Sequence, residues 1–551
     1  MKLCNYIILF LGSCLFVISS CSKKHEISSI TGWEYNNPKN GGFEAKLDYK
    51  EQATGPGLMF VEGGAFTMGR TEQDVFADWN NVPKTVTVSS FYLDETEVRN
   101  VDYLEYLHWT KRMYGQSYPE VFKKALPDTL VWRDKIGFNE PYVEGYLRHP
   151  AFRNYPVVGV SWIQANDYCV WRTDRVNEKI LIDACVIKPD YDQIDENTFN
   201  LDAYLSGQYE GIMACGIINL NPTLGEEKRR ARMEDGLLLP RYRLPTEAEW
   251  EFAALGYIGN TIDENISERR LHPWNGSSVR NGNKKNQSQI MANFKKGRGD
   301  NMGVAGNLND NADITAPVLS YWPNDYGLFC MAGNVSEWVM DVYRPVIELT
   351  TTTDHRPFRG SVFKTQKRDG DGFIEEKDSL GRITMVNVNV EDNVYRRNYK
   401  KADNINYNDG DIESQMGIDW NNFLDEESGT DIADVAIDKR NSNRSFSDGS
   451  SSEGEVSKYK DNRTGNSAEM YDYGNTTLVS DRTRVYKGGS WKDRAYWLVP
   501  GTRRFLDQDQ STDAIGFRCA MDRMGAPTSN LRENQRRGTD YSQKKMGSNR
   551  R

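Results

Sequence analysis

The side chains best suited to metal chemistry are carboxylates in the segment 367–378, together with eight cysteines spread along the chain. Asp369, Asp371 and Gly372 fall in register with a calcium-binding loop, where oxygen ligands suit Ca²⁺. Lys367 stands at the position of the first acidic ligand, so we expect an ordinary Asp-Gly turn and not a strong calcium site. The five histidines have no metal-like spacing, so a hydrolase-type metal centre is not expected.

The composition excludes several classes of protein. The chain has 551 residues, and 79 acidic against 69 basic side chains give a net charge of −10. This charge argues against an extended phosphate-binding surface, so nucleic acid is not an expected partner. Eight cysteines in this length are too few for a disulfide-framework fold. Beyond the N-terminus, no segment approaches the roughly 20 apolar residues that span a bilayer.

The N-terminus predicts export and lipid attachment. Lys2 precedes an apolar run over residues 6–18, which has the length of a signal-peptide core and not of a spanning helix. Residues 18–21, Ile-Ser-Ser-Cys, resemble a bacterial lipobox, in which the cysteine thiol is lipidated before cleavage. An ordinary secretory peptide cut after one of the two serines is the alternative. We therefore predict a signal peptide over 1–20 and a lipid anchor on Cys21.

The residues next to this anchor favour the periplasmic face of an outer membrane. Residues 22–26 contain no Asp and no paired acids, whereas acid-rich positions there resemble a surface-export signal. The polar, Gly/Asn-rich stretch up to residue 55 is expected to act as a tether, so that 21–55 joins the anchor to the folded part.

Two capping boxes predict helix starts. Ser161 with Gln164, and Thr246 with Glu249, can exchange hydrogen bonds between side chain and backbone. The first of these helices should end at about Val176, and the second should follow Pro245. Further elements are expected as a helix beginning at Val101, Leu104 and His108, and as short strands at 58–61, 66–68, 86–88 and 91–93, the first two around a Gly turn.

Two polar stretches interrupt this pattern. Residues 177–240 fit no strong period, and 346–480 are rich in Asp, Asn, Gly, Ser and Arg with few large aliphatic side chains. The second stretch cannot bury enough apolar surface for its own core, so we expect a solvent-exposed, partly disordered insertion. The chain ends in a basic tail, 523–551, which is suited to an acidic patch on a partner.

Five separated blocks resemble the formylglycine-generating-enzyme/sulfatase-modifying-factor family. They read VEGGAFTMG at 61–69; PVVGVSW at 156–162; RLPTEAEWE at 243–251; NDYGL at 324–328 with GNVSEW at 333–338; and GGSW at 488–491 with GFR at 516–518. The resemblance implies an α+β fold: a single irregular domain built from 56–345 and 481–522, distantly like C-type lectins, with long polar insertions.

The resemblance also implies where an active site would lie. The family's enzymes need two copper-binding cysteines just beyond the Gly-Gly-Ser-aromatic turn, because Cu(I) selects sulfur ligands. Asp493 and Leu498 stand at those positions, and Ser336 replaces an aromatic side chain near the oxygen site. Among the positions that resemble the family's active site, only Ser490 keeps the family's residue. The resemblance therefore predicts no enzyme activity, no catalytic residue and no copper.

Two calcium sites are implied by the same resemblance. In the first, the ligands match the Asn293 side chain, the Phe294 carbonyl, Asp310 and the Ala312 carbonyl. All four can supply oxygen to Ca²⁺. The alternative is that Asn293 and Asp310 cap turns.

The second implied calcium site is less complete. The carbonyls of Gly333 and Val335 and the carboxylate of Glu337 match its ligands. Cys330 replaces an Asn there, and a thiol is a poor ligand for a hard cation.

The cysteines give one implied disulfide and leave one pairing open. Cys169 and Cys519 match a disulfide of the family, which an oxidising periplasm permits. Cys185 and Cys215 lie in the first insertion and can pair, which leaves Cys330 over.

Within the family, the lipobox, the length and the Asp/Asn-rich insertion look most like the J-type gliding-motility lipoproteins. This implies a non-catalytic, lipid-anchored structural component of the outer-membrane machinery for gliding motility and type IX secretion. The implied partners are the shorter K-type gliding lipoprotein and other outer-membrane gliding components. The alternatives are a formylglycine-generating-type oxidase and a calcium-dependent glycan-binding protein.

Overall fold

The computed structural model describes residues 27–46, 51–69, 83–134, 137–220, 228–256, 270–274, 278–296, 312–343, 364–387 and 482–525. Cys21, Asp310, most of the insertion 346–480 and the tail beyond 525 lie outside these residues. The chain divides into two compact units. The larger one holds the described residues of 51–178, 191–210 and 239–525, and the smaller one holds those of 27–46, 179–190 and 211–238.

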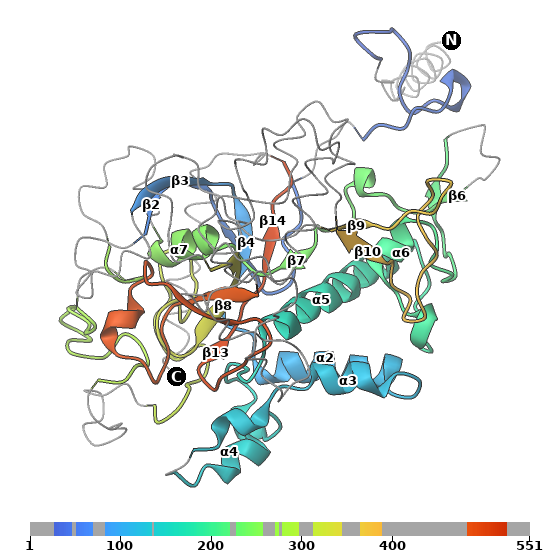
Figure 1. The fold of residues 1–551 in the computed structure, drawn as a ribbon. Helices are drawn as coiled ribbons and strands as arrows, with labels where there is room; N and C mark the ends of the chain where they lie inside the picture. Colours follow the sequence, from blue (N-terminus) through green and yellow to red (C-terminus); the bar gives the residue numbers. More distant parts are fainter. Residues whose placement is uncertain are drawn as a thin grey trace, which may run out of the picture. The chain divides into compact units, whose positions relative to one another are not determined.

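Two four-stranded sheets form the frame of the larger unit (Figure 1). The first is antiparallel, in the order β1 (Leu58–Val61), β4 (Phe91–Asp94), β14 (Ala520–Asp522) and β7 (Tyr242–Arg243). The second has the order β12 (Arg504–Asp507), β11 (Thr483–Lys487), β8 (Ser336–Val342) and β13 (Ile515–Gly516), and only β13 runs parallel to its neighbour. Residues 482–525 therefore supply strands to both sheets.

The four strands predicted near the N-terminus are confirmed, but the first two are not partners. β1 pairs with β4, while β2 (Gly64–Met68) pairs with β3 (Lys84–Val88). The bend between β1 and β2 passes close to the end of β3, because a Cβ on Gly63 would lie 2.3 Å from the Val88 carbonyl oxygen. Strand alternation predicts a strand and a buried face, but not which neighbour it joins.

The helices of the described chain are α2 (Asn100–Tyr114), α3 (Pro119–Ala125), α4 (Glu140–Gly145), α5 (Trp162–Asp183), α6 (Leu201–Leu205) and α7 (Glu247–Leu255). Both predicted capping boxes are confirmed. The Gln164 N–H donates to Ser161 Oγ at 3.3 Å, and the Ser161 N–H donates to Gln164 Oε1 at 3.0 Å. At α7, the Glu249 N–H donates to Thr246 Oγ1 at 3.2 Å.

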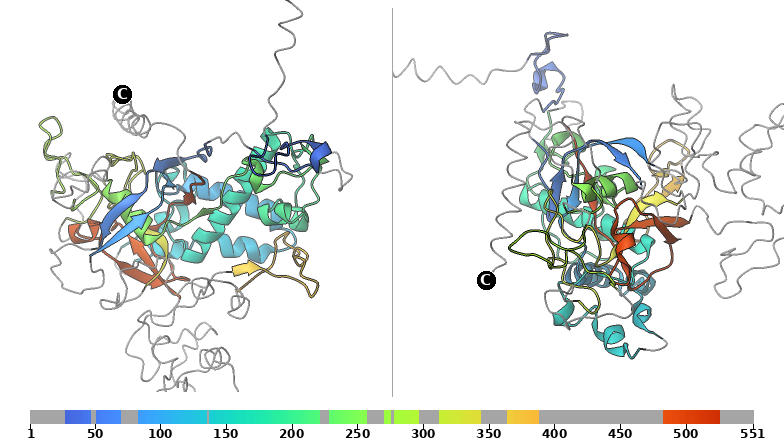
Figure 2. Two further views of the ribbon diagram at one scale, coloured as in Figure 1. Left: turned by 90° about the horizontal axis from the view of Figure 1, so that it is seen from above. Right: turned by 90° about the vertical axis from the view of Figure 1, so that its left-hand side faces the viewer.

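Helix α5 is about two turns longer than the sequence predicted, since it ends at Asp183 and not near Val176. The Asn177 side chain donates to the Thr173 carbonyl and exchanges hydrogen bonds with the Leu239 backbone. These buried partners satisfy a side chain that would otherwise favour a helix end. Within the larger unit, α5 lies beside α2 (Figure 2), with Tyr168 stacked on Tyr103 at a centroid distance of 5.8 Å.

The predicted insertions contain regular structure. The first holds α6 and a two-stranded ribbon of β5 (Ile217–Ile218) and β6 (Lys228–Arg229), where Arg229 donates to Glu44 at 2.6 Å and to Asp235 at 2.7 Å. In the second, β9 (Lys364–Gln366) pairs with β10 (Met385–Asn387). Between them Asp369 Oδ1 accepts from the Asp371 and Phe373 N–H groups, so the predicted Asp-Gly turn is confirmed.

The main core of the larger unit lies where α7 packs against β2, β3, β8 and β11. Trp250, Phe252, Ala253 and Ala254 of α7 are fully buried there, as expected for a short helix that is apolar on most sides. The predicted mixture of helices and strands is thus confirmed. Among the described residues, no helix combines the length and apolarity needed to cross a membrane.

Candidate functional site

Three of the sequence blocks, 243–251, 333–338 and 516–518, meet in a buried ionic cluster. Arg518 is fully buried and donates to both carboxylate oxygens of Glu337, each at 2.6 Å. Trp250 Nε1 donates to the same carboxylate at 2.7 Å. Glu97, also fully buried, accepts from Asn334 Nδ2 at 2.8 Å, and its pKa is raised well above the usual range by burial and by the nearby charge of Glu337. These groups hold the sheets together from inside and have no exposed side on which to meet a substrate.

A second buried cluster uses the acids of the RLPTEAEWE block. Lys487, at the end of β11, lies 3.1 Å from Glu247 and 3.0 Å from Glu251. Arg503 lies 2.8 Å from Glu247. The pKa of Asp341 is raised well above its usual range by burial and by Glu247. The most distinctive residues of this block therefore tie α7 to the second sheet.

The turn after β11 holds Ser490 and Asp493, which stand where the family resemblance puts catalytic residues. Ser490 Oγ donates to Asp493 Oδ2 at 2.5 Å. Arg504 of β12 donates to both oxygens of Asp493 at 2.7 Å, and also to Ser336 Oγ at 2.7 Å. Gly489 allows this turn, since it has φ +69° and a Cβ there would lie 2.8 Å from the Trp497 carbonyl oxygen.

Asp493 and Arg504 form an ion pair that packs against aromatic rings. Arg504 lies over the rings of Tyr486 and Trp497, with its guanidinium carbon 4.8 Å and 4.7 Å from their centroids. Leu498 is completely buried in a small apolar cluster. Hydroxyl, carboxylate and guanidinium groups bind one another here, and they offer no soft ligand for a copper ion.

Removing the Asp493 carboxylate should destabilise the fold. In Asp493→Ala the half-buried Arg504 loses a bidentate charged partner, which is worth about 1.5–3 kcal/mol. Asp493→Asn keeps one acceptor and should lose less. Urea unfolding of the three proteins checks this, and equal stabilities would contradict a structural role for the pair.

The first implied calcium set is only partly described. Asn293 is buried, and its Nδ2 donates to the Ile314 carbonyl at 2.8 Å and to Asn334 Oδ1 at 3.2 Å. Phe294 and Ala312 are both buried, but Asp310 is outside the described residues. Asn293 thus ties loops together through its amide nitrogen, and calcium at this set stays a prediction.

The second implied calcium set fits the cation poorly. Both oxygens of Glu337 already accept from Arg518, and one also accepts from Trp250. Cys330 directs its thiol to the Val318 carbonyl. A calcium ion at Gly333, Val335 and Glu337 would have to compete with a buried guanidinium, so we do not propose one. Within the described residues, no group of three or more His, Cys, Asp or Glu is arranged to hold a metal ion.

Cys169 of α5 and Cys519, just before β14, meet in the interior. Both side chains are buried, and the two sulfurs lie 3.4 Å apart. A covalent bond would need about 2.05 Å, so the thiols are adjacent and not bonded in this structure. The predicted disulfide therefore remains a prediction, with its two cysteines already placed side by side.

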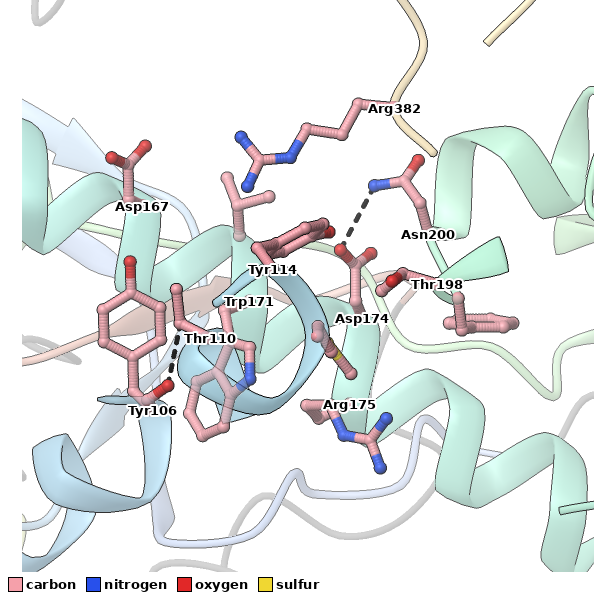
Figure 3. Close-up of a pocket in the computed structure, with 13 residues that line it drawn as sticks. Tyr106, Thr110, Tyr114, Asp167, Trp171, Asp174, Arg175, Thr198, Asn200 and Arg382 are labelled. Atoms are coloured by element: carbon pink, nitrogen blue, oxygen red, sulfur yellow. Dashed lines mark hydrogen bonds between the residues drawn. The ribbon is translucent and has the colours of Figure 1, made fainter. Parts of the chain in front are cut away.

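A pocket of about 50 Å³ in the larger unit was not anticipated from the sequence (Figure 3). It lies between α2 and α5, and residues of both predicted insertions complete its lining. Those residues are Tyr106, Thr110, Met113, Tyr114, Asp167, Val170, Trp171, Asp174, Arg175, Thr198, Phe199, Asn200 and Arg382. In the described part of the chain, the buried Trp171 Nε1 has no hydrogen-bond partner. The insertions lack a period, so nothing in the sequence indicated that they pack here.

Asp174 should make stability fall as the pH rises from about 4 to 7. Burial raises its pKa from 3.8 to about 7, although the Leu201 N–H and Asn200 Nδ2 donate to it. In this range the folded state binds more protons than the unfolded state, so raising the pH favours unfolding. Asp174→Asn should make this slope shallower in urea unfolding at several pH values. An unchanged slope would contradict the assignment.

Comparison with known proteins gives the family. The sequence model of the domain family described as "Sulfatase-modifying factor enzyme 1-like domain" matches residues 44–383, more than half of the chain. The formylglycine-generating enzyme of Mus musculus is 26% identical over 333 residues, which cover 55% of this chain and 66% of that enzyme. That of Streptomyces coelicolor is 25% identical, covering 56% of this chain and 76% of its own.

Further similar proteins include one named as inactive and several solved structures. The "Inactive C-alpha-formylglycine-generating enzyme 2" of Mus musculus is 24% identical, covering 56% of this chain and 75% of its own. Solved structures include PvdO from Pseudomonas aeruginosa, at 14% identity and a TM-score of 0.38, covering 86% of this chain and all of that one. Another is Treponema denticola variable protein 1, at 16% identity and a TM-score of 0.33, covering 84% and 94%. On the family match, the chain belongs to the sulfatase-modifying factor enzyme 1-like domain family.

Proposed function

We propose that this protein is a non-catalytic, lipid-anchored outer-membrane component of the gliding-motility and type IX secretion machinery. The observation that carries the non-catalytic part is the Asp493–Arg504 ion pair. It fills the place where the family resemblance puts a metal-binding cysteine, and it also engages Ser490 and Ser336. The existence of family members named as inactive is compatible with this proposal.

The family motifs support a scaffold role. Their charged residues, such as Glu337, Arg518 and Lys487, lie in the core, where they hold the two sheets and α7 together. A rigid frame of this kind can carry loops and insertions on its surface, and those are the parts that commonly bind partners. The K-type gliding lipoprotein and other outer-membrane gliding or secretion components are the proposed partners, and the basic tail is proposed to bind an acidic patch on one of them.

Affinity isolation from cell envelopes tests this proposal. The full-length lipoprotein, tagged in an exposed loop and isolated with mild detergent, should bring down other outer-membrane lipoproteins identified by mass. A Cys21→Ser variant should be lost from the membrane fraction, and a protein lacking 526–551 should fold but retain its partners less well. Isolation of the intact protein alone, with no companion above the level of a tag-only control, would contradict the proposal.

No formylglycine should be produced by this protein. A cysteine-containing sulfatase-type peptide, incubated with the protein, copper and a reductant, should keep its thiol, because the described groups bound to Asp493 are a hydroxyl and a guanidinium and not soft ligands for Cu(I). Mass spectrometry of the peptide measures the product. Conversion above that of heat-treated protein would instead support the oxidase.

A further inference from the structure

The C-terminal end of α5 has an unusual residue at its cap. The Cys185 N–H donates to the Ile182 carbonyl at 2.9 Å, and the Val186 N–H donates to the Leu181 carbonyl at 2.8 Å. These two bonds form the motif that ends helices with a left-handed residue. Cys185 holds that position with φ +57°, where glycine is normally favoured because a Cβ costs energy there.

The chain returns beside this cap at residues 212–215, near the middle of the first insertion. Ile187 and Met213 form an antiparallel bridge, and the Ala214 N–H donates to the Val186 carbonyl at 3.0 Å. The Cys215 N–H then donates to the Cys185 carbonyl at 2.8 Å. Residues 185–188 and 212–215 therefore form a short antiparallel ribbon, in which the two cysteines are neighbours.

The distance between them suits a disulfide. A hydrogen bond of 2.8 Å joins the Cys215 nitrogen to the Cys185 oxygen. Adding about 1.5 Å from that nitrogen to its Cα, and about 2.4 Å from that oxygen to its Cα, bounds the Cα–Cα distance at about 6.7 Å. Disulfides usually join Cα atoms about 4.4–6.8 Å apart. Both thiols are exposed, so an oxidant can reach them.

We propose that Cys185 and Cys215 form a disulfide when the protein meets a disulfide oxidant. Each thiol gives up a proton, one S–S bond forms, and the two electrons reduce the oxidant's disulfide to two thiols. The oxidant is a thiol–disulfide oxidoreductase or a small disulfide such as oxidised glutathione. The bond holds the left-handed cap and closes the chain between residues 186 and 214.

This bond accounts for a cysteine at a glycine position. The 186–214 segment contains η4 (Asp195–Asn197) and α6, and it carries the Thr198, Phe199 and Asn200 lining of the pocket. Fixing its two ends reduces the freedom of the unfolded chain, which is the chief way a disulfide stabilises.

A digest with an enzyme that cuts after glutamate tests the pairing. Cleavage after Glu178, Glu196, Glu210 and Glu226 separates the cysteines onto peptides 179–196 and 211–226. The full-length protein is incubated with oxidised glutathione, its free thiols are alkylated, and it is digested without reductant. We expect the two peptides to be found linked, and to separate on reduction. Finding them only as separate peptides overturns the proposal.

Two variants sharpen this experiment. Cys330→Ser should leave the linked peptides unchanged, whereas Cys215→Ser should abolish them and leave Cys185 open to alkylation. Cys185→Gly suits the left-handed backbone, so it should raise the melting temperature of the reduced protein and lower that of the oxidised protein. The same direction of change in both states would overturn the proposed bond.

Discussion

Replacing Arg518 with methionine should lower the free energy of unfolding by about 3–5 kcal/mol, because breaking a buried ion pair leaves a charge without its partner. The guanidinium is fully buried and donates to both oxygens of Glu337, and also to the backbone carbonyls of Asp94 and Phe329. Without it, the buried Glu337 carboxylate loses its cation, while the charge of the buried Glu97 nearby still acts on it. Urea unfolding followed by tryptophan fluorescence measures the loss.

A matched surface variant separates burial from simple loss of charge. Arg133 pairs with Glu140 at 2.8 Å, but both side chains are more than one-third exposed. Arg133→Met should therefore change stability little, since exposed ion pairs contribute little. The double variant Arg518→Met/Glu337→Leu should be less destabilised than the sum of its single variants. Equal effects of Arg518→Met and Arg133→Met would contradict the buried network.

Oxidation of the Cys169–Cys519 pair should raise the free energy of unfolding by on the order of 5 kcal/mol. The two cysteines are 350 positions apart in sequence, so a bond between them closes most of the folded chain into one loop. Burial and the neighbouring thiol raise the pKa of Cys519 well above its usual range, so the bond should form slowly once the protein has folded. Unfolding with and without reductant measures the gain.

The control for this prediction isolates one pair of cysteines. In a Cys185→Ser/Cys215→Ser background, reductant should destabilise the protein, whereas the further change Cys519→Ala should remove that sensitivity. Cys330→Ala should keep it, because this thiol contacts the Val318 carbonyl and not another sulfur. Insensitivity to reductant in the Cys185→Ser/Cys215→Ser protein would contradict the predicted bond.

Local signals predicted the elements of this fold well. The capping boxes at Ser161 and Thr246 fixed the starts of α5 and α7, because the caps use residues within one turn of the helix. Alternating apolar residues located the first four strands. The end of α5 was wrong by about two turns, since Asn177 finds buried partners that lie far away in sequence.

The candidate site was predictable only as a set of positions. The sequence indicated that Asp493 and Leu498 matter, since they replace the family's metal ligands. It gave no sign that Arg504 binds Asp493 or that Arg518 binds Glu337, because each pair joins separate segments that only the fold brings together. The pocket between α2 and α5 was missed because its lining includes the aperiodic insertions.

The sequence alone determined the family, the positions of its motifs, and the residue types that stand where its catalytic sulfur ligands belong. Tertiary structure decided that β1 joins β4 and not β2, that β14 completes the first sheet, and that Cys185 lies beside Cys215. The physical reason is the distance along the chain over which each kind of interaction acts. Caps, turns and apolar periods act within a few residues, whereas ion pairs, strand partners and thiol neighbours depend on burial shared by segments that lie from tens to hundreds of residues apart.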